Sequence, residues 1–189
     1  MVLTQTPEPK FGSKAPPFTL TGMDGKVHTL DQCRGPLGLL VMFICNHCPY
    51  VQALRDRLVT DMRDIQAAGV GVVAICSNDP KDYAEDSFEH LQQQSREWGF
   101  TFPYLHDRTQ EVARAYGAVC TPDFFGYNAN LELQYRGRLD AGHRGPRLGG
   151  MRRELVESMH EIARSGRSKS PQTASMGCSI KWTTGALAR

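Results

Sequence analysis

The chain has 189 residues, 40% of them hydrophobic and 22% charged, which suits one globular α/β domain with a buried core and leaves no room for a second large domain. The formal net charge is +2, and although residues 134–189 carry 11 basic and 4 acidic side chains, they show no aromatic interleaving or known binding motif, which argues against a nucleic-acid partner. The first residues contain no apolar run typical of a secretory signal or a transmembrane helix, so we expect no membrane partner and a cytoplasmic location.

The first half of the chain predicts a β-hairpin, a buried strand and a long helix. Residues 18–30 hold two short apolar segments around Asp24-Gly25, a dipeptide typical of tight hairpin turns. Residues 37–44 are almost entirely apolar, as in a central strand that is covered on both faces. Over residues 48–69 apolar side chains recur every three or four positions, which predicts an amphipathic helix that ends at a glycine. A Cys-x-x-Cys pair therefore lies where the strand gives way to the helix.

Strands and helices continue to alternate in the second half, which predicts an α/β fold with parallel strands and an antiparallel hairpin at the sheet edge. We therefore expect one domain at residues 1–166, a central mixed β-sheet flanked by helices, and a tail at 167–189 that docks on the domain through apolar residues near Cys178. The further predicted elements are a strand at 70–77, a helix at 78–99, a strand at 102–105, a helix at 109–116, hairpin strands at 123–127 and 131–135, and a final helix at 151–162.

The Cys-x-x-Cys pair, Cys45 and Cys48, is the strongest chemical signal. The chain holds six cysteines, but it is neither short nor poor in core residues, as disulfide scaffolds are. In such a chain this spacing indicates redox chemistry or metal binding. A thiol attacks a disulfide as the thiolate, which a helix N-terminus stabilises. We therefore expect Cys45 to be the exposed nucleophile, Cys48 to resolve the mixed disulfide, and a protonated His47 to lower the pKa of Cys45 further.

Two other interpretations of the pair stay open. Cys45, His47 and Cys48 could bind zinc or copper(I), although structural zinc needs four ligands and the sequence shows no second close pair of Cys or His residues. The two cysteines could also simply fill space in the core, as free cysteines commonly do.

Six blocks of sequence spread over nearly the whole chain carry a family resemblance. They are Gly-Ser-Lys-Ala-Pro-Pro-Phe at 12–18, Phe-Ile-Cys-Asn-His-Cys-Pro-Tyr-Val at 43–51, Ser-Asn-Asp at 77–79, Phe-Pro-Tyr-Leu at 102–105, Thr-Gln-Glu-Val-Ala at 109–113 and Gly-Cys-Ser-Ile-Lys-Trp at 177–182. Together they resemble the thioredoxin superfamily, in particular its peroxiredoxin-like (redoxin) branch. The resemblance implies a thioredoxin fold with a redoxin-type N-terminal hairpin and an inserted strand and helix. It also implies that Pro122 is a cis-proline opposite the cysteine pair and that Thr121 offers backbone hydrogen bonds to a substrate chain.

The chain departs at three places from the families that it resembles. Thioredoxins have Trp before the first cysteine and Gly-Pro within the pair, where this chain has Ile44 and Asn46-His47, so the redox potential stays open. The buried acid that thioredoxins use as proton acceptor is replaced by Leu39. Peroxiredoxins have Thr or Ser three residues before their reactive cysteine, and Met42 in that position argues against peroxidase activity.

We therefore predict a thiol–disulfide oxidoreductase that acts on protein or low-molecular-weight thiols and disulfides, with a reductase or thiol donor as partner and no cofactor. The alternatives are a thiol-dependent peroxidase and a metal-binding protein. Cys120, close to the expected cis-proline, and Cys178, in the tail, are either further redox partners or packing residues. Cys76 is predicted to be a core residue and Cys33 has no assigned role. The substrate, the direction of electron flow and the oligomeric state are left open.

Overall fold

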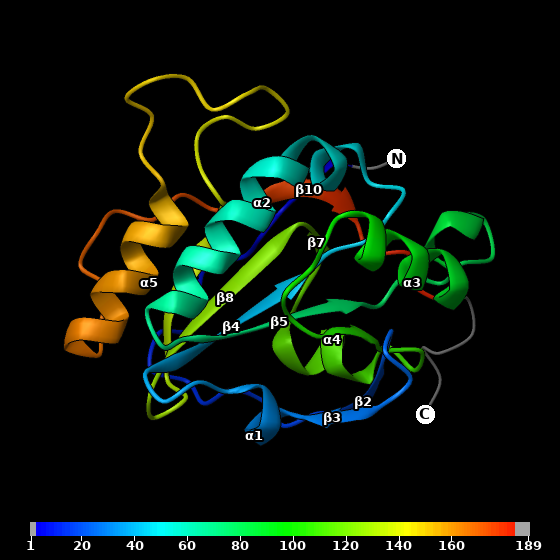
Figure 1. Ribbon diagram of the computed structural model, residues 1–189, viewed down its shortest axis with the longest axis horizontal. Helices are drawn as coiled ribbons and strands as arrows, with labels where there is room; N and C mark the ends of the chain where they lie inside the picture. Colours follow the sequence, from blue (N-terminus) through cyan, green and yellow to red (C-terminus); the bar gives the residue numbers. More distant parts are fainter. Residues whose placement is uncertain (1–2, 184–189) are drawn as a thin grey trace.

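The computed structural model describes residues 3–183 and is built around one seven-stranded mixed β-sheet (Figure 1). Strands β4, β5 and β6 are parallel, and the other neighbours pair antiparallel. This arrangement confirms the predicted α/β fold with a hairpin at the sheet edge. In order across the sheet the strands are β3 (Val27–Thr29), β2 (Thr19–Gly22), β6 (Tyr104–His106), β5 (Gly71–Cys76), β4 (Gly38–Phe43), β8 (Asp123–Asn128) and β9 (Leu133–Gly137).

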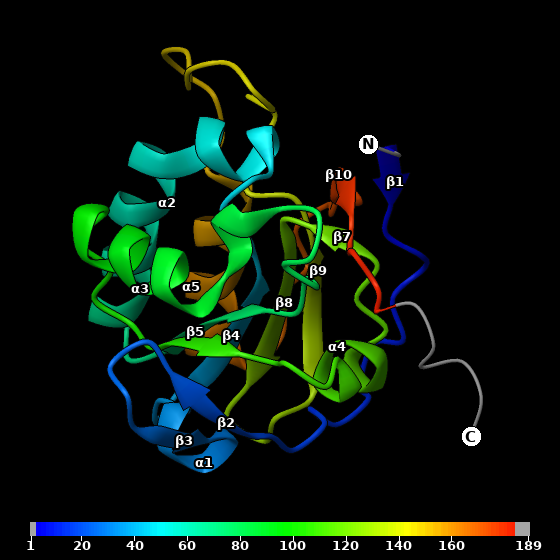
Figure 2. The ribbon, with the colours of Figure 1, turned by 90° about the vertical axis from the view of Figure 1, so that its right-hand side faces the viewer.

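Helices cover both faces of the sheet (Figure 2). Helices α2 (Pro49–Ala67), α3 (Phe88–Glu97) and α5 (Glu154–Ser165) lie on one face, and the short helices α1 (Leu30–Cys33) and α4 (Glu111–Tyr116) contribute to the core of the other. Each face buries its own hydrophobic cluster, so the central strands are enclosed on both sides. No helix within residues 3–183 is both long and apolar enough to cross a membrane.

Strand β4 and helix α2 have the form that their sequence pattern predicts. All six residues of β4 are buried between the two helical layers. Helix α2 begins at Pro49, a residue suited to the first helical position because its missing N–H has no partner there in any case. The helix ends just before Gly69, which adopts a φ of 82° that favours glycine. The loop that joins β4 to α2 carries the two cysteines.

The helix predicted at residues 78–99 starts later than expected. Residues 78–83 form a loop, followed by the short 3-10 helix η1 (Ala84–Asp86) and then α3. In the loop the side chain of Asp79 accepts a hydrogen bond from the N–H of Lys81 at 3.0 Å, and its own N–H donates to the carbonyl of Lys181 at 2.8 Å. These bonds compete with helical ones, as Asp and Asn side chains often do. The final helix likewise begins at Glu154 rather than at 151.

A second, three-stranded sheet was not predicted. It has the order β1 (Leu3–Gln5), β10 (Met176–Ser179) and β7 (Cys120–Thr121), with all pairs antiparallel. The central strand β10 belongs to the segment predicted as a tail, of which residues 184–189 lie outside the described part of the chain. Pairing with β7 brings this segment next to the cysteine loop.

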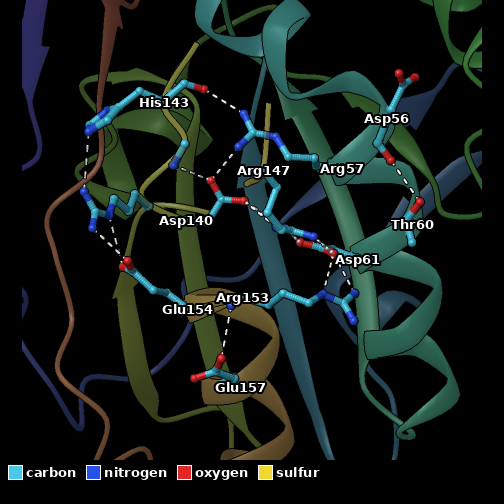
Figure 3. Close-up of polar contacts among 12 residues, drawn as sticks. Asp56, Arg57, Thr60, Asp61, Asp140, His143, Arg147, Arg153, Glu154 and Glu157 are labelled. Atoms are coloured by element: carbon cyan, nitrogen blue, oxygen red, sulfur yellow. Dashed lines mark hydrogen bonds and ion pairs between the residues drawn. The ribbon is translucent and has the colours of Figure 1, made fainter. Parts of the chain in front are cut away.

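A long loop at residues 138–153 joins β9 to α5 and rises beyond α2 in Figure 1. Ion pairs hold it to α2 (Figure 3). Asp61 of α2, whose side chain is fully buried, pairs with Arg147 and Arg153 of the loop, while Asp140 pairs with Arg147 and with Arg57 of α2. The loop is therefore fixed by shared charges rather than by regular secondary structure.

Candidate active site

The cysteine loop is buried. Cys45 and Cys48 are both 0% exposed. The expectation that Cys45 is exposed and lies at the helix N-terminus is wrong, because α2 starts at Pro49 and its N-cap residue is Cys48. The N–H of Val51 in the first turn bonds to Cys48, so the free backbone donors of the helix end act on the second cysteine instead of the first.

The structure brings Thr121 and Pro122 against the two cysteines. The Thr121–Pro122 peptide bond is cis, as predicted. The Sγ of Cys45 lies 3.2 Å from the Oγ1 of Thr121, and the Sγ of Cys48 lies 3.2 Å from the carbonyl oxygen of Thr121, to which Cys48 donates when it is protonated. In strand pairing, however, Thr121 faces Cys178 of β10. The backbone edge that we expected to receive a substrate chain is thus taken by a strand of the same molecule.

His47 points to a carboxylate that the sequence did not single out. Its Nδ1 lies 2.5 Å from the Oδ2 of Asp86 and 3.7 Å from the Sγ of Cys45, and its ring stacks on Tyr83 with centroids 3.9 Å apart. The other oxygen of Asp86 accepts the backbone N–H groups of Asn46 and His47 at 2.8 and 3.1 Å. Asp86 therefore fixes both residues between the cysteines.

Hydrogen bonds concentrate negative charge on Cys48. A bond from the Cys45 thiol lowers the pKa of Cys48 against the opposing effect of burial, and bonds from Thr121, Cys178 and the N–H of Val51 lower it further. Burial raises the pKa of Cys45 well above its ordinary value, and the bond to Cys48 and the negative charge of Asp86 add to this increase. Of the two thiols, Cys48 is therefore the one with the lower pKa.

The pKa of Asp86 itself is lowered. Burial alone would raise it, but the hydrogen bonds from His47 and Asn78 and the charge of His47 outweigh burial. Asp86 is thus a carboxylate at neutral pH, and it works against ionisation of Cys45, in contrast to the effect that we expected from His47.

Among residues 3–183, one group of side chains could hold a metal ion. The thiol of Cys45, the imidazole of His47 and the carboxylate of Asp86 are all buried and lie within 4.8 Å of one another. This set differs from the predicted one, since Asp86 replaces Cys48. Three donors with an open fourth position are typical of catalytic rather than structural zinc sites.

The other cysteines differ in their surroundings. Cys76 is fully buried in the core, as expected, and burial raises its pKa. Burial also raises the pKa of Cys33 to about 11 and that of Cys120 further still. The Sγ of Cys120 lies 3.9 Å from the carbonyl oxygen of Pro122. Cys178 is 3% exposed and hydrogen-bonds to Cys48.

Asp86, Asn78 and Tyr83 are the residues of the site that sequence reasoning missed. Asn78 was noted only as part of a family block, yet its Nδ2 donates to Asp86 at 2.8 Å and its Oδ1 accepts the N–H of Lys181 at 2.9 Å. A sequence signal was present in that block, because a polar Ser-Asn-Asp directly after a buried parallel strand lies at the same sheet edge as the cysteine loop.

Comparison with known proteins shows which family the chain is similar to. The model of the AhpC/TSA family matches residues 11–141. A relative from Mycobacterium tuberculosis named "Putative peroxiredoxin" is 30% identical over 124 residues, which cover 66% of this chain and 74% of the relative. The thiol-disulfide oxidoreductase ResA of Geobacillus thermodenitrificans is 30% identical over 130 residues, which cover 65% of this chain and 66% of ResA.

Two solved structures show the fold. An uncharacterized conserved protein from Geobacillus kaustophilus is 40% identical, with a TM-score of 0.89 and coverage of 98% of both chains. The thioredoxin domain of a thiol-disulfide oxidoreductase from Bacteroides vulgatus is 17% identical, with a TM-score of 0.56 and coverage of 68% of this chain and 89% of that domain. The latter likeness concerns the fold alone, and it confirms the predicted thioredoxin fold.

Proposed function

The chain belongs to the AhpC/TSA family, and from this premise we propose that it catalyses thiol–disulfide exchange through Cys45 and Cys48. The observation that carries the proposal is the convergence of both sulfurs on Thr121 beside the cis-Pro122 bond, at 3.2 Å each, and the lowered pKa of Cys48 agrees with it. A pair with one stabilised thiolate can exchange with disulfides at neutral pH. Relatives named as oxidoreductases support the same class of reaction.

The exchange runs in two steps. Cys45 passes its proton to the Cys48 thiolate and attacks one sulfur of the substrate disulfide, so that the substrate S–S bond breaks and a Cys45–substrate disulfide forms. The second substrate sulfur leaves as a thiolate and takes up the proton from Cys48. Cys48 then attacks the sulfur of Cys45, which forms the Cys45–Cys48 disulfide and releases the first substrate sulfur. The leaving thiolate thus serves as the proton acceptor that Leu39 cannot provide.

The remaining site residues position this chemistry. Thr121 holds both sulfurs from one side, and Pro122 prevents a backbone N–H from competing for them. His47, held by Asp86, keeps the turn between the cysteines in one conformation. A small cavity lined by Tyr50, Pro122 and Met176 lies on one side of the cis-proline. We propose protein or low-molecular-weight disulfides as substrates and a thiol donor or reductase as electron source.

Redox equilibration tests the proposal. The purified protein is incubated in glutathione buffers of defined ratio, its thiols are alkylated, and the oxidised pair is located by mass spectrometry, with Cys45→Ser as control. A reversible Cys45–Cys48 disulfide is the expected result. A midpoint potential of about −270 mV favours a reductant and one of about −120 mV an oxidant. If the two cysteines never pair in the folded protein, the proposal is wrong.

Peroxide reduction is the second candidate. The relative named "Putative peroxiredoxin" supports it, and the hydroxyl of Thr121, 3.2 Å from the Sγ of Cys45, supplies a polar hydrogen next to the sulfur where Met42 cannot. Consumption of hydroperoxide that depends on Cys45 and on an added thiol separates this activity from plain exchange.

Stoichiometric zinc or copper in protein purified without chelator would instead favour a metal site. The cytoplasmic location stays a prediction that cell fractionation can test.

A further inference from the structure

Cys178 is held next to Cys48 by the second sheet. Strand β10 pairs antiparallel with β7, and this register places Cys178 opposite Thr121. Thr121 in turn contacts the sulfurs of Cys45 and Cys48. Cys178 and Cys48 share a hydrogen bond, which lowers the pKa of Cys48 and raises that of Cys178. Cys178 therefore joins Cys45 and Cys48 next to Thr121, beside the cis-proline.

The strand that carries Cys178 is fixed on both sides. On its outer side β10 pairs with β1, where Leu3 faces Cys178. Next to β10, the hydroxyl of Ser175 donates to the carbonyl of Pro122 at 2.7 Å, and the N–H of Ile180 donates to the carbonyl of Val119 at 3.0 Å. A chain added to a free strand edge binds through such backbone bonds. Cys178 thus takes the place that a cysteine of a bound chain would have beside the pair.

We propose that Cys178 is a third redox-active cysteine, which accepts the active-site disulfide from Cys45 by exchange at the sulfur of Cys48. This step rests on the proposed function, because it starts from the Cys45–Cys48 disulfide. The Cys178 sulfur loses its proton and attacks Cys48, so that a Cys48–Cys178 bond forms while the Cys45–Cys48 bond breaks. Cys45 leaves with the bonding electron pair and takes up the proton. One disulfide replaces another, so no additional oxidant or reductant is needed.

Oxidation of Cys48 makes Cys178 a better nucleophile. In the reduced state burial raises the pKa of Cys178, and the hydrogen bond and negative charge at Cys48 raise it further, while Lys181 lowers it. When Cys48 is in a disulfide, it carries no negative charge. The positive charge of Lys181 then lowers the pKa of Cys178 without opposition from a charge on Cys48. Cys178 reacts after the Cys45–Cys48 disulfide has formed, because its sulfur needs that S–S bond to attack.

The exchange has a structural consequence. A Cys48–Cys178 disulfide ties β10 to the start of helix α2 and leaves Cys45 as a thiol beside His47. The protein thus has two oxidised forms at the same oxidation level, one with a Cys45–Cys48 disulfide and one with a Cys48–Cys178 disulfide. They differ in which sulfur is available to a substrate.

Disulfide mapping of the full chain tests this proposal. Wild type, Cys45→Ser, Cys178→Ser and the matched control Cys33→Ser, which changes a buried cysteine in the other hydrophobic cluster, are incubated with oxidised glutathione, quenched, alkylated and digested. In wild type we expect both Cys45–Cys48 and Cys48–Cys178 linked peptides, and the same in Cys33→Ser. Cys45→Ser should form the Cys48–Cys178 link in most molecules, and Cys178→Ser only the Cys45–Cys48 link.

The outcomes separate the two proposals. If wild type forms the Cys45–Cys48 link while Cys178 is fully alkylated, the role of Cys178 is wrong and the proposed function stands. If wild type forms neither link, thiol–disulfide exchange is wrong, and the Cys178 step with it. A stable Cys48–glutathione adduct with alkylated Cys178 in Cys45→Ser would also overturn the Cys178 step. Because the wild-type map decides by itself, misfolding of a variant does not remove the test.

Discussion

The carboxylate of Asp86 binds both the backbone and the side chain of His47. One carboxylate oxygen accepts the N–H of His47 at 3.1 Å and the other lies 2.5 Å from its Nδ1, and both side chains are buried. Two more donors, the N–H of Asn46 and the side chain of Asn78, reach the same carboxylate. The conformation between the cysteines is therefore set by a residue about 40 positions away in the sequence.

Replacement of Asp86 by Ala should destabilise the protein by about 3–5 kcal/mol, because a buried partner is removed and its donors are left unsatisfied. The free energy of unfolding in urea measures the loss. Glu85→Ala, which changes the exposed neighbour, should stay within about 0.5 kcal/mol of wild type. Equal unfolding midpoints for the two variants would show that Asp86 does not hold the loop.

Replacement of Thr121 by Val should raise the pKa of Cys48 by about one unit, since the lost hydroxyl donor is worth about 1 kcal/mol. The ultraviolet absorbance of the thiolate in the reduced protein, followed against pH, measures the shift. The other cysteines with resolved shifts have raised pKa values, so the acid part of the titration reports Cys48. Thr121→Ser keeps the hydroxyl and should titrate like wild type; a shift of the same size in both variants would contradict this account.

Much of the fold could be predicted from local patterns. Strand β4 and helix α2 were predicted nearly to their ends because burial on both faces and a helical apolar stripe leave clear sequence signals. Strands β1 and β10 left none, since they are short and gain their order from pairing with each other and with β7. Pairing between residues far apart in the chain has no local signature.

The site could be predicted only in part. The cysteine pair, Thr121 and Pro122 lie together as the family resemblance implied. Asp86 was not foreseen, because it is one of several acidic residues in a polar loop and the sequence does not show which one turns inward. The difference in pKa between Cys45 and Cys48 depends on the Asp86 carboxylate and on Cys178, so it could not be predicted either.

Replacement of Asp61 by Asn should loosen the loop at 138–153. Asp61 is buried and accepts hydrogen bonds from Arg147 and Arg153, whose side chains are 19% and 33% exposed (Figure 3). Because the partners are partly solvated, we expect a cost of about 1–3 kcal/mol, which raises the population of the open loop at least about fivefold. Faster trypsin cleavage within the loop measures the opening. Asp56→Asn, at a fully exposed side chain on the same helix, should leave the cleavage rate unchanged; equal rates in both variants would contradict the role of Asp61.

Replacement of Asp123 by Asn should remove a pH dependence of stability. Burial raises the pKa of Asp123 to about 7, although the charge and hydrogen bond of Arg136 oppose this. Between the unfolded pKa of about 4 and the folded value, the folded protein holds a proton that the unfolded chain has lost. The contribution of protonated Asp123 to the free energy of unfolding is therefore complete below a pH of about 4, and it is lost as the pH rises through about 7. Relative to Asp123→Asn, wild type should lose about 3 kcal/mol of unfolding free energy between pH of about 5 and 8, measured in urea. A difference between the two proteins that is constant or grows with pH would show that Asp123 is ionised throughout and that Arg136 outweighs burial.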